Sequence, residues 1–369
     1  MKKIICFLLG GLFLFTFSCN RKNKEEEKAA EAIVLTQNSV TAFARQIENS
    51  VINGISSFYN DAFDKKYIKQ AISDNSIVYS SLDLDLGKEL FNNCFQEGEK
   101  AVKIIEKGGD FKFVRYYYIE KEHHIVFRTY DDFIVNFYDY IVDTADAKIK
   151  IKDGFIYNLS NTFINDVRSS MLYSIMQHTN PDRNHSEIKK VIQLMENHRY
   201  SEALKILEKE QKSLKIYPMY WQLYLSNLYK CNSGIFIKTL DQLQKEGLDE
   251  RYILLHKLFF LSNTGNISET ENIINRLIPF SGDDPIYLLF YGKANYNAKN
   301  YQDALICYES AEEVMPLLWD LWYGKLECYD KLNDRTGFHK TLEKGENAYK
   351  MSKDELLQLT NQYFPKMIK

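Results

Sequence analysis

The sequence contains none of the short motifs that mark common catalytic sites. There is no GxSxG nucleophile elbow, no GxxxxGK[ST] phosphate loop, no GxGxxG after an expected strand and no HExxH zinc motif. Each motif places a particular nucleophile, phosphate cradle or metal ligand, so their absence argues against the corresponding enzyme classes. We therefore expect that the protein is not an enzyme and that it uses no cofactor and no metal.

An excess of positive charge and a cluster of cysteines are also missing. The chain has 47 lysines and arginines against 50 aspartates and glutamates, so its formal net charge is −3 at pH 7 and gives no electrostatic reason to bind nucleic acid. Four of the six cysteines lie beyond residue 19, scattered and without a CxxC pair: Cys94, Cys231, Cys307 and Cys328. We expect buried free thiols, and a bridge between Cys307 and Cys328 is the alternative.

The N-terminus has an apolar run that is short for a membrane span. Residues 1–3 (MKK) are cationic and residues 4–17 are apolar, whereas a spanning helix needs roughly 20 apolar residues. The run ends in TFSC, residues 16–19, which resembles the lipobox of bacterial lipoproteins, although Thr16 and Phe17 depart from its usual small and aliphatic residues. The resemblance implies a signal peptide over residues 1–18 and lipid attachment at Cys19. An uncleaved N-terminal anchor is the alternative.

Residues 19–36 continue into a polar segment rich in lysine and glutamate. This composition cannot bury enough apolar surface to fold, so we expect a solvated tether. Two or more acyl chains on Cys19 would anchor the protein stably, where one chain would be marginal. Glu25, Glu26 and Glu27 also resemble a surface-export signal of Bacteroidetes lipoproteins, with a plain spacer as the alternative. We expect a lipid-anchored protein of the bacterial cell envelope, in the outer membrane, on its periplasmic or its surface side.

Residues 37–182 change from a helical to a strand period. Apolar residues recur at three- and four-residue steps from Val40 to Phe58, and again from Leu90 to Ile105, which predicts two amphipathic helices. Four segments within residues 111–157 are rich in β-branched and aromatic residues and predict a four-stranded antiparallel meander. In the last strand lysines alternate with isoleucines, so we expect one wet face and one face packed on helices.

A further helix N-capped by Ser160 is expected to run to the break at residues 180–182 (NPD). A tight turn or bulge is expected at Asp153 and Gly154. The segment is therefore expected to be an α+β domain over residues 37–182. Its element order resembles the cystatin-like or nuclear-transport-factor-like cone, a resemblance that carries no functional residue.

From His185 onward the pattern is helical throughout. Residues 284–316 resemble a tetratricopeptide repeat (TPR), with Pro285 as its first position and the signature small, aromatic and proline residues Gly292, Tyr301, Ala304, Tyr308, Ala311 and Pro316. Neighbouring segments keep this spacing more loosely, and we expect about five helix pairs over residues 185–360. The resemblance implies an all-α TPR-like superhelix over residues 183–369, in a multidomain chain whose repeats lie farthest from the tether.

In tetratricopeptide repeats, positions 2, 5, 9 and 12 of the first helix line the groove. The resemblance assigns these positions to Ile286, Leu289, Lys293 and Tyr296. Lysine also falls at position 9 of the adjacent repeats, at Lys257 and Lys325. A ladder of these three lysines would suit a protein or peptide partner with an acidic segment or a carboxylate tail. Three ordinary solvated lysines are the alternative. We expect a protein–protein interaction scaffold anchored to the membrane.

A pocket inside the α+β domain is the rival binding mode, for an envelope ligand or glycan. Arg115, Arg128 and Asp139 lie within expected strands and are candidates to line it, and the tyrosine-rich strands offer stacking faces. His123 and His124 beside Glu122 carry metal-ligand side chains. Consecutive strand residues point to opposite faces, however, so a solvated hairpin tip is the favoured interpretation of this cluster.

The lipid attachment site can be tested with the substitution Cys19→Ala. The variant should lose acyl labelling and leave the membrane fraction, because the thioether to the lipid needs the Cys19 sulfur. Metabolic labelling with an alkyne-tagged fatty acid, followed by membrane fractionation, measures both effects. Cys94→Ala is the matched control and should keep the label. Normal labelling of Cys19→Ala would contradict the assignment.

Overall fold

The computed structural model describes residues 34–73, 78, 80, 84–131, 134–179, 183–215, 220–349 and 352–368. The expected signal peptide, Cys19, most of the tether and the break at residues 180–182 lie outside these residues. Within the described part of the chain, no helix is both long and apolar enough to cross a membrane.

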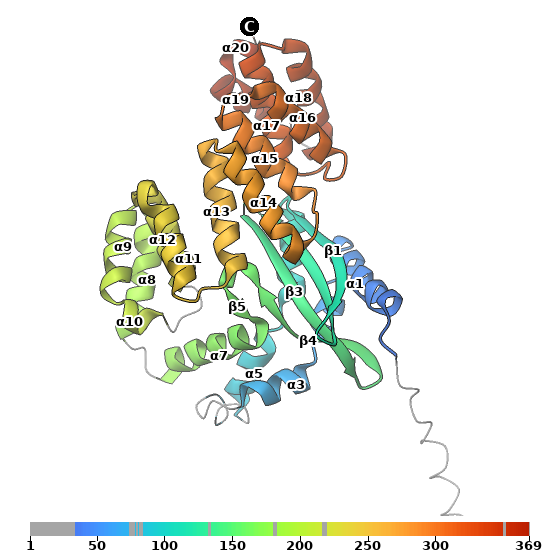
Figure 1. Cartoon of the computed structure of the whole chain (residues 1–369), viewed down its shortest axis with the longest axis vertical. Helices are drawn as coiled ribbons and strands as arrows, with labels where there is room; N and C mark the ends of the chain where they lie inside the picture. Colours follow the sequence, from blue (N-terminus) through green and yellow to red (C-terminus); the bar gives the residue numbers. More distant parts are fainter. Residues whose placement is uncertain are drawn as a thin grey trace, which may run out of the picture.

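The fold is mixed α+β, with an antiparallel sheet in the N-terminal half and mostly helices after it (Figure 1). Before the sheet come the helices α1 (Gln37–Ile52), α2 (Ser57–Asp61), α3 (Lys65–Ile72), α5 (Asp85–Asn93) and α6 (Glu97–Glu106). The sheet has five strands in sequential order: β1 (Asp110–Ile119), β2 (Glu122–Asp131), β3 (Ile134–Ala145), β4 (Lys148–Ile156) and β5 (Asn161–Thr162). The short 3₁₀ helix η1 (Tyr157–Leu159) joins the last two strands.

Helices make up the rest of the described chain. The long α7 (Phe163–Thr179) follows the sheet. Next come α8 (Arg183–Glu196), α9 (Tyr200–Lys209), α10 (Gln211–Leu214), α11 (Tyr220–Cys231), α12 (Ser233–Lys245), α13 (Glu250–Thr264) and α14 (Ile267–Ser281). The last are α15 (Ile286–Asn297), α16 (Tyr301–Glu312), α17 (Trp319–Leu332), α18 (Arg335–Tyr349), α19 (Lys353–Tyr363) and α20 (Pro365–Ile368).

The expected four-stranded meander is confirmed, and the two-residue β5 extends it by a fifth strand. Two bulges interrupt the register. Val114 is the extra residue of β1 opposite β2, and Lys152 is the extra residue of β4 opposite β3. The second bulge lies immediately before Asp153 and Gly154, where the sequence predicts a tight turn or a bulge.

Several helix boundaries differ from the expected ones. The first helix ends at Ile52, because Gly54 turns the chain with a φ of +74°, so Ile55 is 52% exposed instead of buried. The second expected helix is two helices, α5 and α6, separated at residues 94–96. Ser160 does not cap α7, because it adopts a left-handed conformation at the end of η1.

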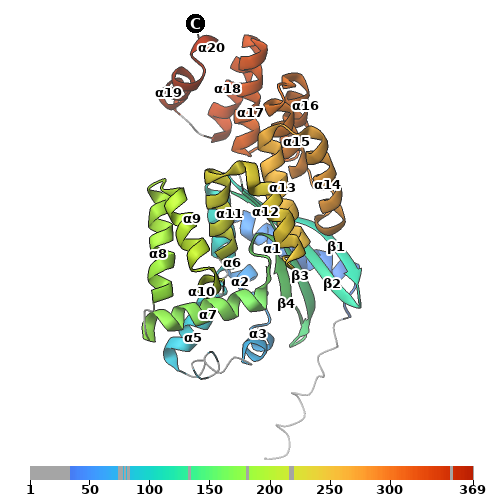
Figure 2. The same ribbon diagram turned by 60° about the vertical axis from the view of Figure 1, so that its left-hand side comes forward.

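Helices cover much of both faces of the sheet, while in β4 Lys148 is exposed and Lys150 and Lys152 are partly buried beside the fully buried Ile151. One face packs on the N-terminal helices and α7 in a core that includes Phe111, Phe127 and Tyr140. The other face packs on the later helices, where Val126 and Phe137 belong to one core with residues of α13 to α18. Figures 1 and 2 both show α13 and α14 over the sheet and α3, α5 and α7 at its other side. The helical half therefore lies against the sheet and does not simply follow it.

Buried charges fix how the helices sit on the sheet. The Arg128 guanidinium of β2 is 1% exposed and donates to carboxylates on both sides, Asp110 of β1 and Asp284 just before α15. The hydroxyl of Tyr130 donates to Asp320 of α17. These contacts join residues that are far apart in sequence, and each polar partner is needed because an unpaired buried charge is costly.

Successive helices of the C-terminal half pack in pairs: α8 with α9, α11 with α12, α13 with α14, α15 with α16 and α17 with α18. The small residues expected at the contacts have that role. A Cβ atom on Gly292 would lie 2.5 Å from the Tyr308 ring, and one on Gly324 would lie 2.7 Å from the same ring. Ala304 and Ala311 are fully buried beside it, so α15, α16 and α17 pack around one tyrosine.

The substitution Asp284→Asn tests the buried ion pair with Arg128. It keeps an oxygen for the Ile286 backbone N–H but removes the charge facing the guanidinium, so we expect a loss of about 3 kcal/mol in the free energy of unfolding. Urea unfolding followed by circular dichroism measures it. Asp61→Asn is the control, because the Asp61 side chain is 76% exposed and pairs loosely with Lys65 at 3.8 Å. Equal stability of the two variants would contradict the assignment.

Candidate functional site

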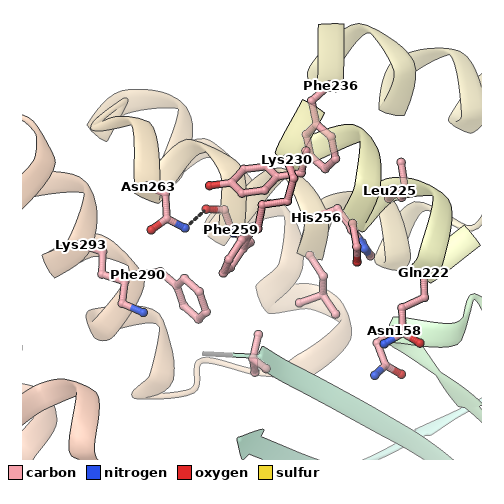
Figure 3. A pocket seen from close by; sticks show the side chains of 14 residues that line it. Asn158, Gln222, Leu225, Lys230, Phe236, His256, Phe259, Asn263, Phe290 and Lys293 are labelled. Carbon is pink, nitrogen blue, oxygen red and sulfur yellow. Dashed lines mark hydrogen bonds between the residues drawn. The ribbon is translucent and has the colours of Figure 1, made fainter. Parts of the chain in front are cut away.

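A pocket with a volume of about 420 Å³ lies where α11, α12, α13 and α15 face one another above the sheet (Figure 3). Its walls are largely apolar and aromatic: Leu225, Tyr229, Phe236, Leu255, Phe259 and Phe290. Val135 of β3 and Asn158 of η1 also line it, so the sheet and the helices build it together. The remaining lining residues are polar: Gln222, Ser226, Lys230, His256, Asn263 and Lys293.

Helical spacing explains how these side chains converge. On α11 the lining residues are Gln222, the adjacent pair Leu225 and Ser226, and the adjacent pair Tyr229 and Lys230. Residues three and four positions apart lie on the same face of a helix, so these side chains all face the pocket. On α13 the lining residues from Leu255 to Asn263 also follow one face of the helix, with one adjacent pair, Leu255 and His256. The two faces meet because α12 returns the chain between them, and α15 adds Phe290 and Lys293 from the next pair.

His256 supplies a neutral hydrogen-bonding group to the pocket. Burial lowers the pKa of its imidazole to about 4, so the ring is uncharged near neutral pH. Its Nδ1 lies 3.0 Å from the backbone carbonyl oxygen of Tyr252. A carbonyl only accepts, so Nδ1 carries the proton and donates, and Nε2 is left as an acceptor. The pocket therefore holds an acceptor that does not titrate at neutral pH.

Side-chain amides add further acceptors. Asn158 Oδ1 is buried and has no hydrogen-bond partner among the described residues. The Asn263 amide donates through Nδ2 to the carbonyl of Phe259 at 2.7 Å, which directs its oxygen elsewhere. A buried acceptor without a donor costs free energy, and a bound ligand with N–H groups would remove that cost.

Lys257, Lys293 and Lys325 do not form the ladder that the repeat register predicts. Lys257 pairs with Asp241 of α12 at 2.5 Å, and Lys325 pairs with Glu312 of α16 at 2.7 Å. Both side chains are nearly buried and neither lines the pocket. Lys293 does line it, beside Phe290, with its Nζ 5.8 Å from the ring centroid. Burial lowers the Lys293 pKa, while Asp320 and Glu327 of α17 oppose that effect.

The other expected groove residues lie elsewhere. Ile286 and Leu289 are fully buried in the core beneath α15, so they do not line an open groove. Tyr296 is partly buried and packs on Tyr301, with ring centroids 5.5 Å apart. The tetratricopeptide register assigned the buried stripe of α15 to the groove, because nothing in that pattern anticipates a sheet beneath the helices. Leu255, His256 and Phe259 also recur at helical spacing in the sequence, but the tetratricopeptide register does not assign them to the groove.

The residues expected to line a pocket inside the α+β domain instead connect the sheet to the helices. Arg115 donates to the carbonyl of Pro279 in α14 at 3.1 Å, and Arg128 forms the ion pairs described above. Asp139 accepts from the Tyr117 hydroxyl at 2.5 Å, and its other oxygen lies 3.0 Å from His124 Nδ1. Asp139 also lies 3.6 Å from the Arg251 guanidinium of α13, so each of the three residues contacts one of the later helices or the segment just before one.

The histidine pair lies at the β1–β2 hairpin. His123 Nδ1 lies 2.9 Å from the Tyr116 hydroxyl, and His124 Nε2 is 3.9 Å from Glu122. Within the described residues, no group of three or more His, Cys, Asp or Glu side chains is arranged to hold a metal ion. Cys307 and Cys328 are both buried free thiols in this structure.

Comparison with known proteins gives no match. No family model, curated protein or solved structure is significantly similar to this chain. The chemistry of the pocket is therefore the main guide to its function.

The acid next to Lys293 gives a pH-dependent prediction. Burial raises the pKa of Glu327 from 4.5 to about 7, against the opposing effect of Lys331 and Lys293. When the pKa of a carboxyl group is higher in the folded than in the unfolded chain, its contribution to stability is fully present below the pKa of the unfolded chain. This contribution is lost as the pH rises through the folded-state pKa of about 7. Glu327→Gln should therefore be more stable than the wild type at pH 8, by on the order of 1 kcal/mol, and equal to it at pH 4.

Urea unfolding at pH 4, 6 and 8 measures this difference. The exposed Glu313→Gln is the control and should change the free energy of unfolding by the same small amount at each pH. A difference between Glu327→Gln and the wild type that does not grow with pH would disprove the assignment.

Proposed function

We propose that this protein is a lipid-anchored cell-envelope protein that acts as a protein–protein interaction scaffold. Its helical half, which resembles a tetratricopeptide superhelix, would hold a segment of a partner protein in the pocket between α11, α13 and α15. The tether behind Cys19 would attach the domain that carries this site to the membrane. No catalytic step is proposed.

The observation that supports this proposal is the pocket itself. It combines aromatic walls from Tyr229, Phe259 and Phe290 with polar side chains at both ends. Aromatic side chains in a well-packed recess, surrounded by groups that can hydrogen-bond, are typical of the positions that dominate binding energy at protein interfaces. Because three successive helix pairs contribute to it, an extended segment can contact several helices at once.

A second candidate is an envelope ligand binder. A volume of about 420 Å³ lies within the range of small-molecule pockets, and Val135 and Asn158 close the pocket from the sheet side. A co-purifying compound of low mass in native mass spectrometry would favour this candidate. Cross-linking to a protein would favour the scaffold.

Site-specific photo-cross-linking in intact cells separates the two candidates. A photo-reactive amino acid at Gln222, which lines the pocket, should give a discrete covalent protein adduct. The same amino acid at Lys238, exposed on α12, is the control and should give none. The substitution Ser226→Trp, which fills the pocket, should remove the adduct at Gln222. The absence of an adduct at Gln222, or adducts of equal yield at Gln222 and Lys238, would contradict the proposed scaffold function.

A further inference from the structure

We infer that the pocket holds a tyrosine or tryptophan side chain of the partner segment, an uncharged ring that donates a hydrogen bond, and that it discriminates against phenylalanine and against charged rings. This inference rests on the proposed scaffold function and specifies which side chain of the partner the pocket would hold. Three properties of the pocket support it: its compensated charges, an acceptor on His256 and its aromatic walls.

The interior of the pocket offers no counter-charge to a charged ring. The described lining contains no aspartate or glutamate that could pair with a cation. Lys293 faces Asp320 and Glu327 of α17, so the protein itself compensates its charge, and Lys230 is exposed to water. A charged side chain entering this recess would lose its hydration without gaining an ion pair. An uncharged side chain has no such cost.

His256 gives this interior a hydrogen-bond acceptor. Because its Nδ1 donates to the Tyr252 carbonyl, its Nε2 accepts, and no described residue donates to Nε2. The imidazole also packs on the Tyr252 ring, with centroids 4.2 Å apart, which fixes its orientation. The phenol O–H of a tyrosine or the indole N–H of a tryptophan supplies the missing donor. A phenylalanine would cover Nε2 and leave it unpaired, which costs free energy.

Three uncharged polar side chains lie together on one side of the pocket. Figure 3 shows Asn158, Gln222 and His256 on this side and Phe290 on the opposite one. Asn158 Oδ1 is a second acceptor without a partner among the described residues. A ring with an apolar body and a donor at its edge matches this arrangement, and tyrosine and tryptophan both have that form.

The aromatic walls favour a ring over an aliphatic side chain with a hydroxyl group. Tyr229 packs edge-on against Phe236 and Phe259, with ring centroids 5.6 and 5.7 Å apart. Phe290 lines another side of the same cavity. An entering ring would find faces and edges at the distances that aromatic pairs prefer. The volume of about 420 Å³ is sufficient for the ring of either tyrosine or tryptophan.

The test uses the full-length protein purified in detergent and fluorescein-labelled peptides of nine residues, built of serine and glycine around one central residue. Tyrosine and phenylalanine form the first pair, which differs only in the hydroxyl group. Tryptophan and benzothienylalanine form the second pair, in which sulfur replaces the indole N–H. Fluorescence anisotropy measures the Kd. The tyrosine and tryptophan peptides should each bind about tenfold more tightly than the other member of the pair.

Charged rings test the compensation of charge in the pocket. The central residues 4-carboxyphenylalanine and 4-aminomethylphenylalanine keep the aromatic ring and carry a negative and a positive group. Both peptides should bind about tenfold more weakly than the tyrosine peptide, because the pocket interior offers neither group a free counter-charge. Binding of either charged peptide as tight as that of the tyrosine peptide would overturn the inference.

A histidine variant connects the preference to the pocket. His256→Phe keeps a ring on Tyr252 but removes Nε2. The tyrosine peptide should then bind about tenfold more weakly than to the wild type, and the phenylalanine peptide at least as tightly. His339→Phe, exposed on α18 and outside the pocket, is the matched control and should retain the preference. Thermal unfolding of each variant shows whether it is folded. If His256→Phe does not fold, the paired peptides on the wild type still decide.

Equal affinity within either pair on the wild type, or a preference for tyrosine that His256→Phe retains, would also overturn the inference. This failure is distinguishable from failure of the scaffold itself. A protein adduct at Gln222 without the ring preference would leave the scaffold standing and remove the stated side-chain chemistry. Absence of both the adduct and any peptide binding would remove both.

Discussion

A single buried guanidinium determines how the two halves of this protein fit together. Arg128 lies in β2, the second strand of the sheet, and is compensated by Asp110 of β1 and by Asp284 just before α15. Removing a charge of this kind from water is tolerable only when its partners are in place. The helices are therefore held in one position on the sheet, and the apolar contacts of Val126 and Phe137 fill in around that position.

The pocket is a consequence of this docking. Val135 and Asn158 belong to the sheet and its η1 turn, whereas the other lining residues come from helices up to 158 positions further along the chain. If the helices were free of the sheet, the pocket would lose its floor and the unpartnered acceptor of Asn158 would be exposed to water. The shape of the pocket is thus linked to the same ion pairs that hold the halves together.

The sequence allowed the element types to be predicted, but not the way they meet. Period-two and period-3.6 patterns predicted β1 to β4 and α1, and Gly292 with Tyr308 predicted the close packing of α15 and α16. In the sequence of β2, only the three consecutive apolar residues Ile125 to Phe127 indicated that this strand is buried on both faces, as the structure shows for Ile125 to Tyr130. Contacts such as Arg128 with Asp284 join residues 156 positions apart and leave no local pattern.

The lysines show why a site register cannot be transferred by position alone. Lys257 and Lys325 pair with acids 16 and 13 residues earlier, on the preceding helix. For Lys293, the corresponding part of α14 is residues 277–280, whose sequence Leu-Ile-Pro-Phe offers no carboxylate. Lys293 lines the pocket and faces Asp320 and Glu327 of α17, on the following helix pair. A lysine at the same repeat position therefore faces acids on different helices, the preceding helix for Lys257 and Lys325 and α17 for Lys293.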